Sequence, residues 1–454
     1  MTTIFRAGAA RVNITPPIGV PQAGYGARDR CSDTVDDELF GKALVLDDGD
    51  REIALITTDL IGLTPEFVTR LCSLIQSYTG IPPEHVLACA SHTHFGPALK
   101  RLEYLPEAAN VNFAESYVDN LIRLLAGAVR QAHDARRPAR VGWGVGRTPK
   151  LIFNRRTKKA DGKVIMSWRM PSKEEAAHLT FGPTDPDVGI LKVEDIDGQL
   201  LAALINFACH PVCGVDRMYA ISADYPGYAM RIVERLEGGI SMFALGCAGN
   251  IVPIQREGSA RQWIGRSLGA EALKVLQMVS IMEHAKLGIA NATVELPLKL
   301  PLKVEEARQD VVEAQRLGAG PQVESKSPED ITNPKGNLLL AEHRLHQTTE
   351  AVGKVTVTTQ VQVIRIGDLI LVGLPGEVFV EIGLAIKNAK LSCPVFVFSL
   401  CNDSLAYVPV ASAYEEGGYE PEWTKLGPGA GEILIQTAVN LLRSIQDGSS
   451  EKTE

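Results

Sequence analysis

The chain has 454 residues, 45% hydrophobic and 22% charged, a balance typical of a globular protein with a sizeable core. Its formal net charge of −8 argues against nucleic acid or anionic membrane surfaces as partners, because both attract clustered Lys and Arg. No stretch is apolar for the length of a transmembrane helix, and the N-terminus lacks a signal-peptide pattern, so we expect a cytoplasmic protein without membrane insertion.

The first 150 residues are expected to alternate between strands and helices. Apolar runs predict extended segments at residues 5–14, 43–46 and 53–58, and Asp59 directly follows the last of these. Helical periodicity predicts helices at 65–78 and 114–132.

A strand that begins at Val86 leads directly into two histidines, His92 and His94. In an extended backbone, residues two apart point to the same side, so both imidazoles are expected to face one pocket. Imidazole is the commonest metal-ligand side chain and a proton shuttle near pH 7. Two surface histidines on a loop remain the alternative.

The middle of the chain repeats this arrangement. Residues 150–169 are basic and polar and predict a long loop, and residues 188–193 and 200–209 predict a hairpin whose second strand leads into His210. The other elements predicted in this part of the chain are helices at 224–236, 261–279 and 304–316, a strand at 242–245, and a turn of small residues at 246–250.

The last third predicts strands at 355–366, 369–374 and 395–400 and helices at 379–387 and 431–445. The polar segment 318–335 is expected to be an exposed loop, and the sequence leaves open whether it forms a lid. We expect one catalytic domain over residues 1–447 and a disordered tail at 448–454.

This alternation predicts an α/β fold with mixed sheets flanked by helices, in which ligands gather beyond the carboxyl ends of strands. His92, His210, Glu377 and Tyr407 each follow such an end. Two imidazoles and a carboxylate are the ligands of many hydrolytic zinc sites. Taken singly, Glu377 is better explained by a helix N-terminus and Tyr407 by a half-buried aromatic ring.

Two rival metal sites carry less support. His343 and His346, beside Glu342, lie one turn apart on an amphipathic helix whose charged face is more simply solvated. Cys209 and Cys213 flank His210, but no second cysteine pair completes a structural zinc site.

These residues resemble the neutral/alkaline (non-lysosomal) ceramidases and their bacterial relatives. The resemblance rests on ordered motifs along most of the chain, namely Asn13-Ile14-Thr15-Pro16-Pro17 with Gly24-Tyr25, Asp59, Ser91-His92-Thr93-His94 with Gly96-Pro97, Asn154-Arg155, His210-Pro211, Pro375-Gly376-Glu377, and Asn402-Asp403 through Tyr407 to Tyr414-Glu415.

The resemblance implies one catalytic zinc ion per chain and cleavage of an N-acyl amide bond. It implies His92, His210, Glu377 and Tyr407 as the zinc ligands. It also implies that His94 and Arg155 are catalytic groups that polarise the substrate or stabilise the transition state, and an arginine suits charge developing on a carbonyl oxygen. We expect three further residues to bind substrate, which are Asp59, Asn154 and Asn250.

The chain departs from the family pattern at two motifs. Phe95 stands where the family usually has serine, and the turn 246–250 has no serine where the family carries a Gly-Asp-x-Ser-Pro-Asn loop. Direct attack by a zinc-activated water is therefore favoured over a serine nucleophile. Secreted members also carry a signal peptide and a C-terminal β-sandwich. We expect neither feature here, and we therefore expect a soluble small molecule rather than ceramide as substrate.

Two alternatives stay open. The same metal site suits an ester or a glycosidic bond, because a site on a fold does not fix the substrate. A non-catalytic, metal-dependent binding protein is the other alternative, although it has no need of His94 and Arg155. The sequence leaves the oligomeric state and the identity of the divalent metal open.

Overall fold

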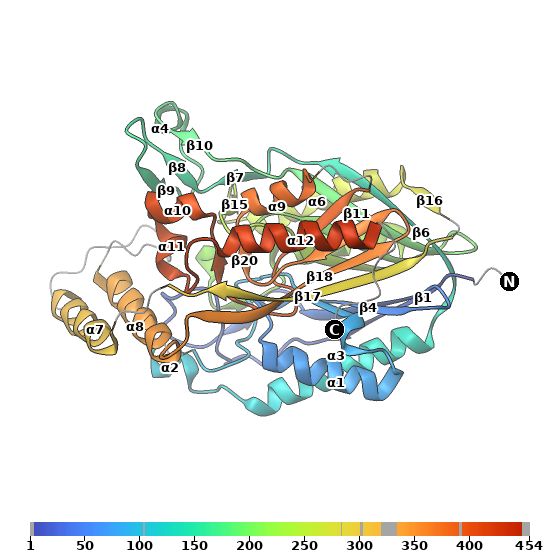
Figure 1. The fold of residues 1–454 in the computed structure, drawn as a ribbon, viewed down its shortest axis with the longest axis horizontal. Coiled ribbons are helices and arrows are strands. Elements are labelled where there is room, and N and C mark those ends of the chain that lie inside the picture. Colours follow the sequence, from blue (N-terminus) through green and yellow to red (C-terminus); the bar gives the residue numbers. More distant parts are fainter. Residues whose placement is uncertain are drawn as a thin grey trace.

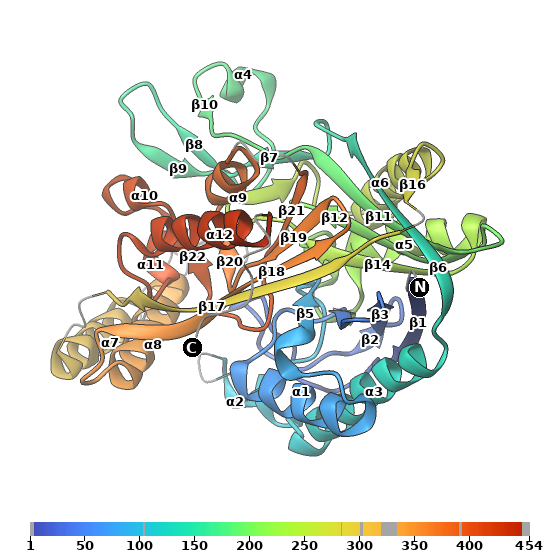
Figure 2. The same cartoon turned by 45° about the vertical axis from the view of Figure 1, so that its right-hand side comes forward.

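The computed structural model describes residues 4–102, 105–282, 284–299, 303–318, 334–389 and 393–446. Two β-sheets stack face to face, and helices cover the outer face of each sheet (Figures 1 and 2). Within the described residues, no helix combines the length and apolar character needed to cross a bilayer.

The larger sheet has nine strands in the order β14-β12-β11-β6-β1-β3-β4-β5, with β16 also paired to β6. Only the pairs β4–β5 and β12–β14 are parallel. The strands are β1 (Arg6–Asn13), β3 (Phe40–Asp47), β4 (Glu52–Thr58), β5 (Val86–Ala90), β6 (Arg137–Arg147), β11 (Asp187–Asp195), β12 (Leu200–Phe207), β14 (Ile240–Leu245) and β16 (Ser280–Met282).

The smaller sheet has four strands in the order β17-β18-β19-β21, of which β19 and β21 are parallel. Its strands are β17 (Leu287–Pro297), β18 (Thr356–Ile366), β19 (Leu369–Gly373) and β21 (Val395–Phe398). Short strand pairs outside the sheets join β2 (Thr34–Val35) to β13 (Ala220–Ile221), β7 (Ile152–Asn154) to β15 (Ile251–Pro253), β8 (Arg156–Lys158) to β9 (Val164–Met166) and β10 (Thr180–Phe181), and β20 (Glu377–Val378) to β22 (Tyr407–Val408).

The helices divide between the two outer faces. Apolar residues of four helices pack on the larger sheet, and these are α1 (Pro65–Thr79), α3 (Glu115–Asp134), α5 (Asp224–Glu237) and α6 (Ala260–Leu276). The smaller sheet is covered by α9 (Val380–Lys387) and α12 (Ala430–Gln446). The remaining helices are α2 (Glu107–Asn110), α4 (Lys173–Ala176), α7 (Val304–Gly318), α8 (Pro334–Glu350), α10 (Ala411–Glu416) and α11 (Tyr419–Trp423), and Figure 1 shows α7 and α8 side by side at one end.

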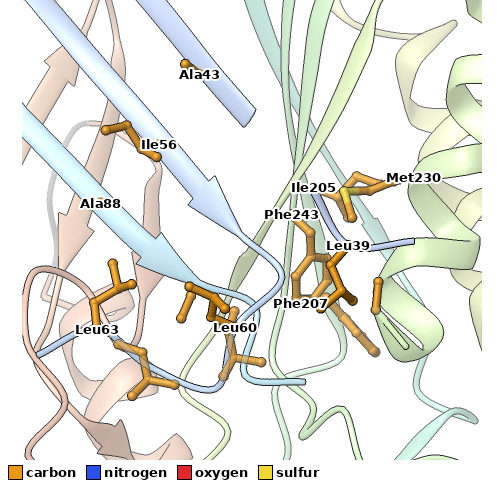
Figure 3. Packing of buried hydrophobic residues seen from close by; sticks show 14 of the residues in the cluster. Leu39, Ala43, Ile56, Leu60, Leu63, Ala88, Ile205, Phe207, Met230 and Phe243 are labelled. Carbon is orange, nitrogen blue, oxygen red and sulfur yellow. The ribbon is translucent and has the colours of Figure 1, made fainter. Parts of the chain in front are cut away.

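Apolar packing fixes the loops that lead to the site. Phe207, at the end of β12, and Phe243, in β14, pack beside Leu39 (Figure 3). Leu60 and Leu63, in the loop after β4, belong to the same buried cluster. Each such side chain stabilises the fold by roughly 1.5–3 kcal/mol relative to exposure to water, so the backbone around the site is held firmly.

The prediction of mixed sheets flanked by helices is confirmed, and so is the hairpin, now β11 and β12. The prediction of a long loop at 150–169 is wrong, because β7, β8 and β9 lie there. The long strands β6 and β17 were not predicted. Most of segment 318–335 and the whole tail 448–454 fall outside the described residues.

Candidate metal centre

His92 and His94 converge, but not by strand alternation. Strand β5 ends at Ala90, and His92 has a left-handed backbone with φ of 68°. Its backbone N–H donates to the Leu60 carbonyl at 2.8 Å, and its Nδ1 lies 2.6 Å from the Ile61 carbonyl. The loop after β4 therefore sets the orientation of this imidazole.

His210 is held in the same way by a different loop. It lies three residues beyond β12, and its backbone N–H donates to the Ile251 carbonyl at 3.0 Å. Its Nδ1 lies 2.5 Å from the Ala248 carbonyl in the turn after β14. A carbonyl only accepts, so Nδ1 carries the proton in both His92 and His210, and each Nε2 presents a lone pair.

Glu377 and Tyr407 come from the smaller sheet's side of the molecule. They are directly paired in the parallel two-stranded sheet of β20 and β22, so their side chains lie on the same face. Glu377 Oε2 lies 3.0 Å from His210 Nε2 and 3.2 Å from His92 Nε2. The structure thus brings four of the predicted residues, including Tyr407, to one place.

Burial dominates the electrostatics of this cluster. It lowers the pKa of His210 to about 4, which keeps this imidazole neutral at pH 7. Burial opposes ionisation of Glu377, and positive charge at His92 and His210 is what holds the carboxyl pKa well below its ordinary value. With both imidazoles neutral, that positive charge must come from a cation. Burial and then the Glu377 charge raise the pKa of the Tyr407 phenol.

The donor set fits a divalent cation. The Nε2 lone pairs of His92 and His210 face an ionised Glu377 oxygen at 3.2 and 3.0 Å. Because each neutral imidazole carries its proton on Nδ1, no proton lies between these nitrogens and the carboxylate. Tetrahedral zinc with bonds of about 2.0 Å places its ligand atoms about 3.3 Å apart. A cation at the centre of His92, His210 and Glu377 relieves the repulsion among these acceptors.

His94 differs from the other two histidines. Its Nε2 lies 3.3 Å from His92 Nε2, and one ligand atom from each of the three histidines lies within 4.8 Å of the others. However, its buried Nδ1 has no hydrogen-bond partner among the described residues. Metal-ligating histidines almost always donate this second N–H, so the geometry favours His94 as a proton carrier. Burial lowers its pKa well below its ordinary value.

Arg155 is held beside Tyr407 by a buried carboxylate that sequence reasoning missed. Its Nε donates to Glu420 Oε1 at 2.8 Å and its second guanidinium nitrogen to the Gly249 carbonyl at 2.8 Å. Arg155 also hydrogen-bonds Tyr407. The other Glu420 oxygen accepts from Arg156 at 2.9 Å, and the Glu420 side chain is fully buried.

Aromatic rings surround the same guanidinium. Its Cζ lies 5.1 Å from the Trp168 ring, 5.4 Å from the Tyr407 ring and 5.6 Å from the Tyr419 ring. Trp168 and Tyr419 were not predicted, because they lie in segments whose place near the centre depends on tertiary packing.

The three residues predicted to bind substrate form hydrogen bonds with protein groups. Asp59 accepts from the Phe40 N–H at 2.8 Å, and burial raises its pKa to about 7. Asn154 donates to the Pro183 carbonyl, and Asn250 bonds the α9 N-terminus through the Val380 N–H and the Glu381 carboxylate. Contact of these side chains with substrate remains a prediction.

The turn 246–250 packs closely against the strand that carries Glu377. The Gly249 N–H donates to the Val378 carbonyl at 2.8 Å, and a Cβ on Gly249 would lie 2.5 Å from the Glu377 carbonyl. Glycine is therefore needed for the turn to approach the strand that carries Glu377.

The rival metal sites stay separate from this cluster. His343 stacks on Trp423, and burial lowers its pKa to about 4, but the described residues form no metal-ligand group with it. Burial raises the pKa of both Cys209 and Cys213 well above the ordinary thiol value.

Comparisons with known proteins agree with this architecture. Residues 5–246 match the family model described as neutral/alkaline non-lysosomal ceramidase, N-terminal. The chain is 23% identical to the neutral ceramidase of Pseudomonas aeruginosa, over 98% of this chain and 72% of that protein, and 21% identical to neutral ceramidase A of Dictyostelium discoideum, over 98% and 73%.

Solved structures share the fold. The crystal structure of the Pseudomonas aeruginosa neutral ceramidase superposes with a TM-score of 0.72 and 18% identity, covering 98% of this chain and 75% of that one. A structure described as ceramidase complexed with C2 superposes with a TM-score of 0.73 and 19% identity, covering 100% and 77%.

Proposed function

The chain belongs to the neutral/alkaline non-lysosomal ceramidase family, and on that premise we propose that it is a metal-dependent amidase that cleaves an N-acyl bond at the His92, His210 and Glu377 centre. The observation that carries this proposal is the convergence of two Nε2 lone pairs on the Glu377 carboxylate at 3.0 and 3.2 Å.

We propose zinc, one ion per chain, as the resident metal, held by His92, His210 and Glu377 with Tyr407 as the further ligand. A zinc ion supplies Lewis acidity, which polarises a carbonyl and lowers the pKa of water towards 7. Borderline-soft imidazole donors with a carboxylate favour zinc over magnesium or calcium, which prefer oxygen ligands.

The neighbouring residues supply proton transfer and orientation. His94 is neutral at pH 7, since its pKa lies well below its ordinary value, so it can accept the proton of the attacking water and return it to the leaving amine. Arg155 orients the Tyr407 hydroxyl and places positive charge beside the reacting carbonyl. No hydroxyl nucleophile is needed, and the turn 246–250 offers none.

The proposed substrate is a soluble N-acyl small molecule. Its support is the formal net charge of −8, which argues against an anionic membrane surface as a partner. The named relatives are ceramidases, so ceramide is the comparison substrate.

The test is a hydrolysis panel run on the purified chain. Short-chain and long-chain N-acyl amines, ceramide in detergent, and matched esters and glycosides are assayed before and after metal removal by a chelator. We expect amide cleavage that disappears on chelation and returns with zinc. Full activity in metal-free protein, or turnover of esters or glycosides alone, would contradict the proposal, and cleavage of ceramide in preference to soluble amides would overturn its substrate.

Two variants separate the roles of the histidines. His94→Ala is expected to keep the metal and lose activity by about 10²–10⁴-fold, the usual range for a lost acid–base group. His92→Ala is expected to lose both. A His94→Ala protein that loses its metal would make His94 a ligand instead.

A further inference from the structure

Two buried cysteines meet where the two sheets come together. Cys89 lies in β5, at the edge of the larger sheet, and Cys401 follows β21, at the edge of the smaller sheet. Their sulfur atoms are 3.0 Å apart, and each residue is 2% exposed. The pair takes no part in the proposed amide hydrolysis.

The backbone places this pair in the geometry that suits a disulfide. Cys89 and Cys401 form an isolated antiparallel bridge. The flanking bonds run from the Ala90 N–H to the Leu400 carbonyl at 3.3 Å and from the Asn402 N–H to the Ala88 carbonyl at 2.8 Å. This pattern defines a non-hydrogen-bonded pair, whose Cα atoms lie about 4.5 Å apart, within the disulfide range of about 4.4–6.8 Å.

The surrounding residues hold this register and leave room for the bond. The Asn402 side chain accepts from the Ala88 N–H at 2.9 Å and donates to Gln362 at 3.0 Å. Gly373 faces Cys401, and a Cβ there would lie 3.1 Å from the Cys401 Cβ and 2.6 Å from a Leu87 methyl. The sulfurs need to approach by only about 1 Å to reach the bond length of about 2.05 Å.

We propose that Cys89 and Cys401 are a redox modification site, a dithiol that a hydroperoxide converts reversibly into a disulfide. One sulfur attacks a peroxide oxygen, the O–O bond breaks, and a sulfenic acid and water form. The second sulfur attacks the sulfenic sulfur, the S–S bond forms, and a second water leaves. Two thiols and one hydrogen peroxide thus become one disulfide and two waters.

The disulfide joins two segments of the metal centre. Cys89 lies three residues before His92, and Cys401 lies six residues before Tyr407. In the oxidised protein the strand that leads to His92 is covalently linked to the segment that leads to Tyr407. The disulfide therefore opposes thermal separation of the two sheets at this point.

The test uses the full-length reduced protein and reads thiols rather than activity. It is treated with limiting hydrogen peroxide, quenched with catalase, alkylated in denaturant and mapped by mass spectrometry. We expect one cross-linked peptide joining Cys89 to Cys401 and two fewer free thiols than the eight of the reduced chain, both reversed by dithiothreitol. Free Cys89 and Cys401 at a dose that oxidises the more exposed Cys31, or sulfinic acid at either position, would overturn the proposal.

Matched variants isolate the pair. Cys401→Ser is expected to abolish the cross-link without creating another, whereas Cys247→Ser, at an equally buried cysteine, should keep it. Oxidation should raise the midpoint of thermal unfolding by about 5 °C in the parent and not in Cys401→Ser. An oxidised parent with an unchanged midpoint of thermal unfolding would refute the inference that the disulfide opposes separation of the two sheets.

Discussion

The Glu420 carboxylate holds two arginines and, through Arg155, the hydroxyl of Tyr407. Glu420 is fully buried, and among the described residues its charge is balanced by Arg155 and Arg156. We predict that Glu420→Gln lowers kcat by about 10–100-fold, the usual effect of a lost outer-shell partner, with little change in KM. Steady-state kinetics with an amide substrate measures both constants.

The matched control for this variant is Glu422→Gln on the same helix. Glu422 pairs with Arg344 on α8, and its side chain is 40% exposed. We expect Glu422→Gln to retain parental kcat. Equal losses in the two variants would show that α11 is merely destabilised and that Glu420 does not position Arg155.

The sequence predicts individual site residues better than their geometry. The side chains of His92, His210 and Glu377 meet as expected, because each follows an apolar strand. The left-handed backbone of His92 was not visible in the sequence, since it depends on hydrogen bonds to the loop after β4. Glu420 gave no signal, because a buried carboxylate and an exposed one look alike until its partners are placed.

At the scale of elements, the loop before Tyr25 sets the position of His94. Gly24 has φ of 109°, and a Cβ there would lie 2.6 Å from His94 Cγ. We predict that Gly24→Ala displaces the imidazole and lowers kcat by about 10²-fold, the effect of a displacement of about 1 Å. Kinetics and metal analysis of the variant would show lost activity with retained metal.

A second glycine provides the control for backbone strain. Gly162 has φ of 82°, and apart from its two chain neighbours no atom of the described residues would lie within 4 Å of a Cβ added there. Alanine at either position costs about 1–2 kcal/mol because the backbone there is left-handed, but only the Cβ of Gly24→Ala contacts His94. Full activity in Gly24→Ala would contradict the steric account.

Strands were missed where glycine replaces the usual β-formers. Strand β6 carries Gly142, Gly144 and Gly146, which lower its apparent β-propensity. A Cβ at Gly144 would lie 2.7 Å from a Val275 methyl of α6, and one at Gly146 would lie 2.2 Å from the Glu271 carboxylate. The glycines allow α6 to approach the sheet closely, a tertiary requirement that the local sequence does not reveal.

At the scale of the whole molecule, buried carboxyls make stability depend on pH. Burial raises the pKa of Asp224 to about 7 from the ordinary value of 3.8. The folded state therefore retains a proton that the unfolded state loses, and stability falls by about 1.4 kcal/mol per pH unit between these two values. Asp59 has a pKa raised to about 7 for the same reason.

Asp224→Asn should remove one of these contributions. Asn tolerates the φ of 54° at this position and, like the protonated acid, carries no charge. We predict that the free energy of unfolding of the variant, relative to the parent, rises from pH 4 to pH 7 and is constant above. Urea unfolding at several pH values measures the difference, and a difference independent of pH would contradict the assignment.

The overall architecture followed from the alternation of strands and helices, and the comparisons support it at the level of fold and family. The single catalytic domain over 1–447 and the cytoplasmic location stay predictions. The face-to-face stacking of two sheets was not predicted, because strand periodicity does not say which sheet a strand joins.

The most direct measurement is the metal content of the purified protein beside a His92→Ala/His210→Ala double variant. The proposed centre predicts about one zinc per chain in the parent and almost none in the variant, with both proteins folded. A folded parent that binds no divalent metal after zinc is supplied, or a double variant that keeps one zinc per chain, would contradict it.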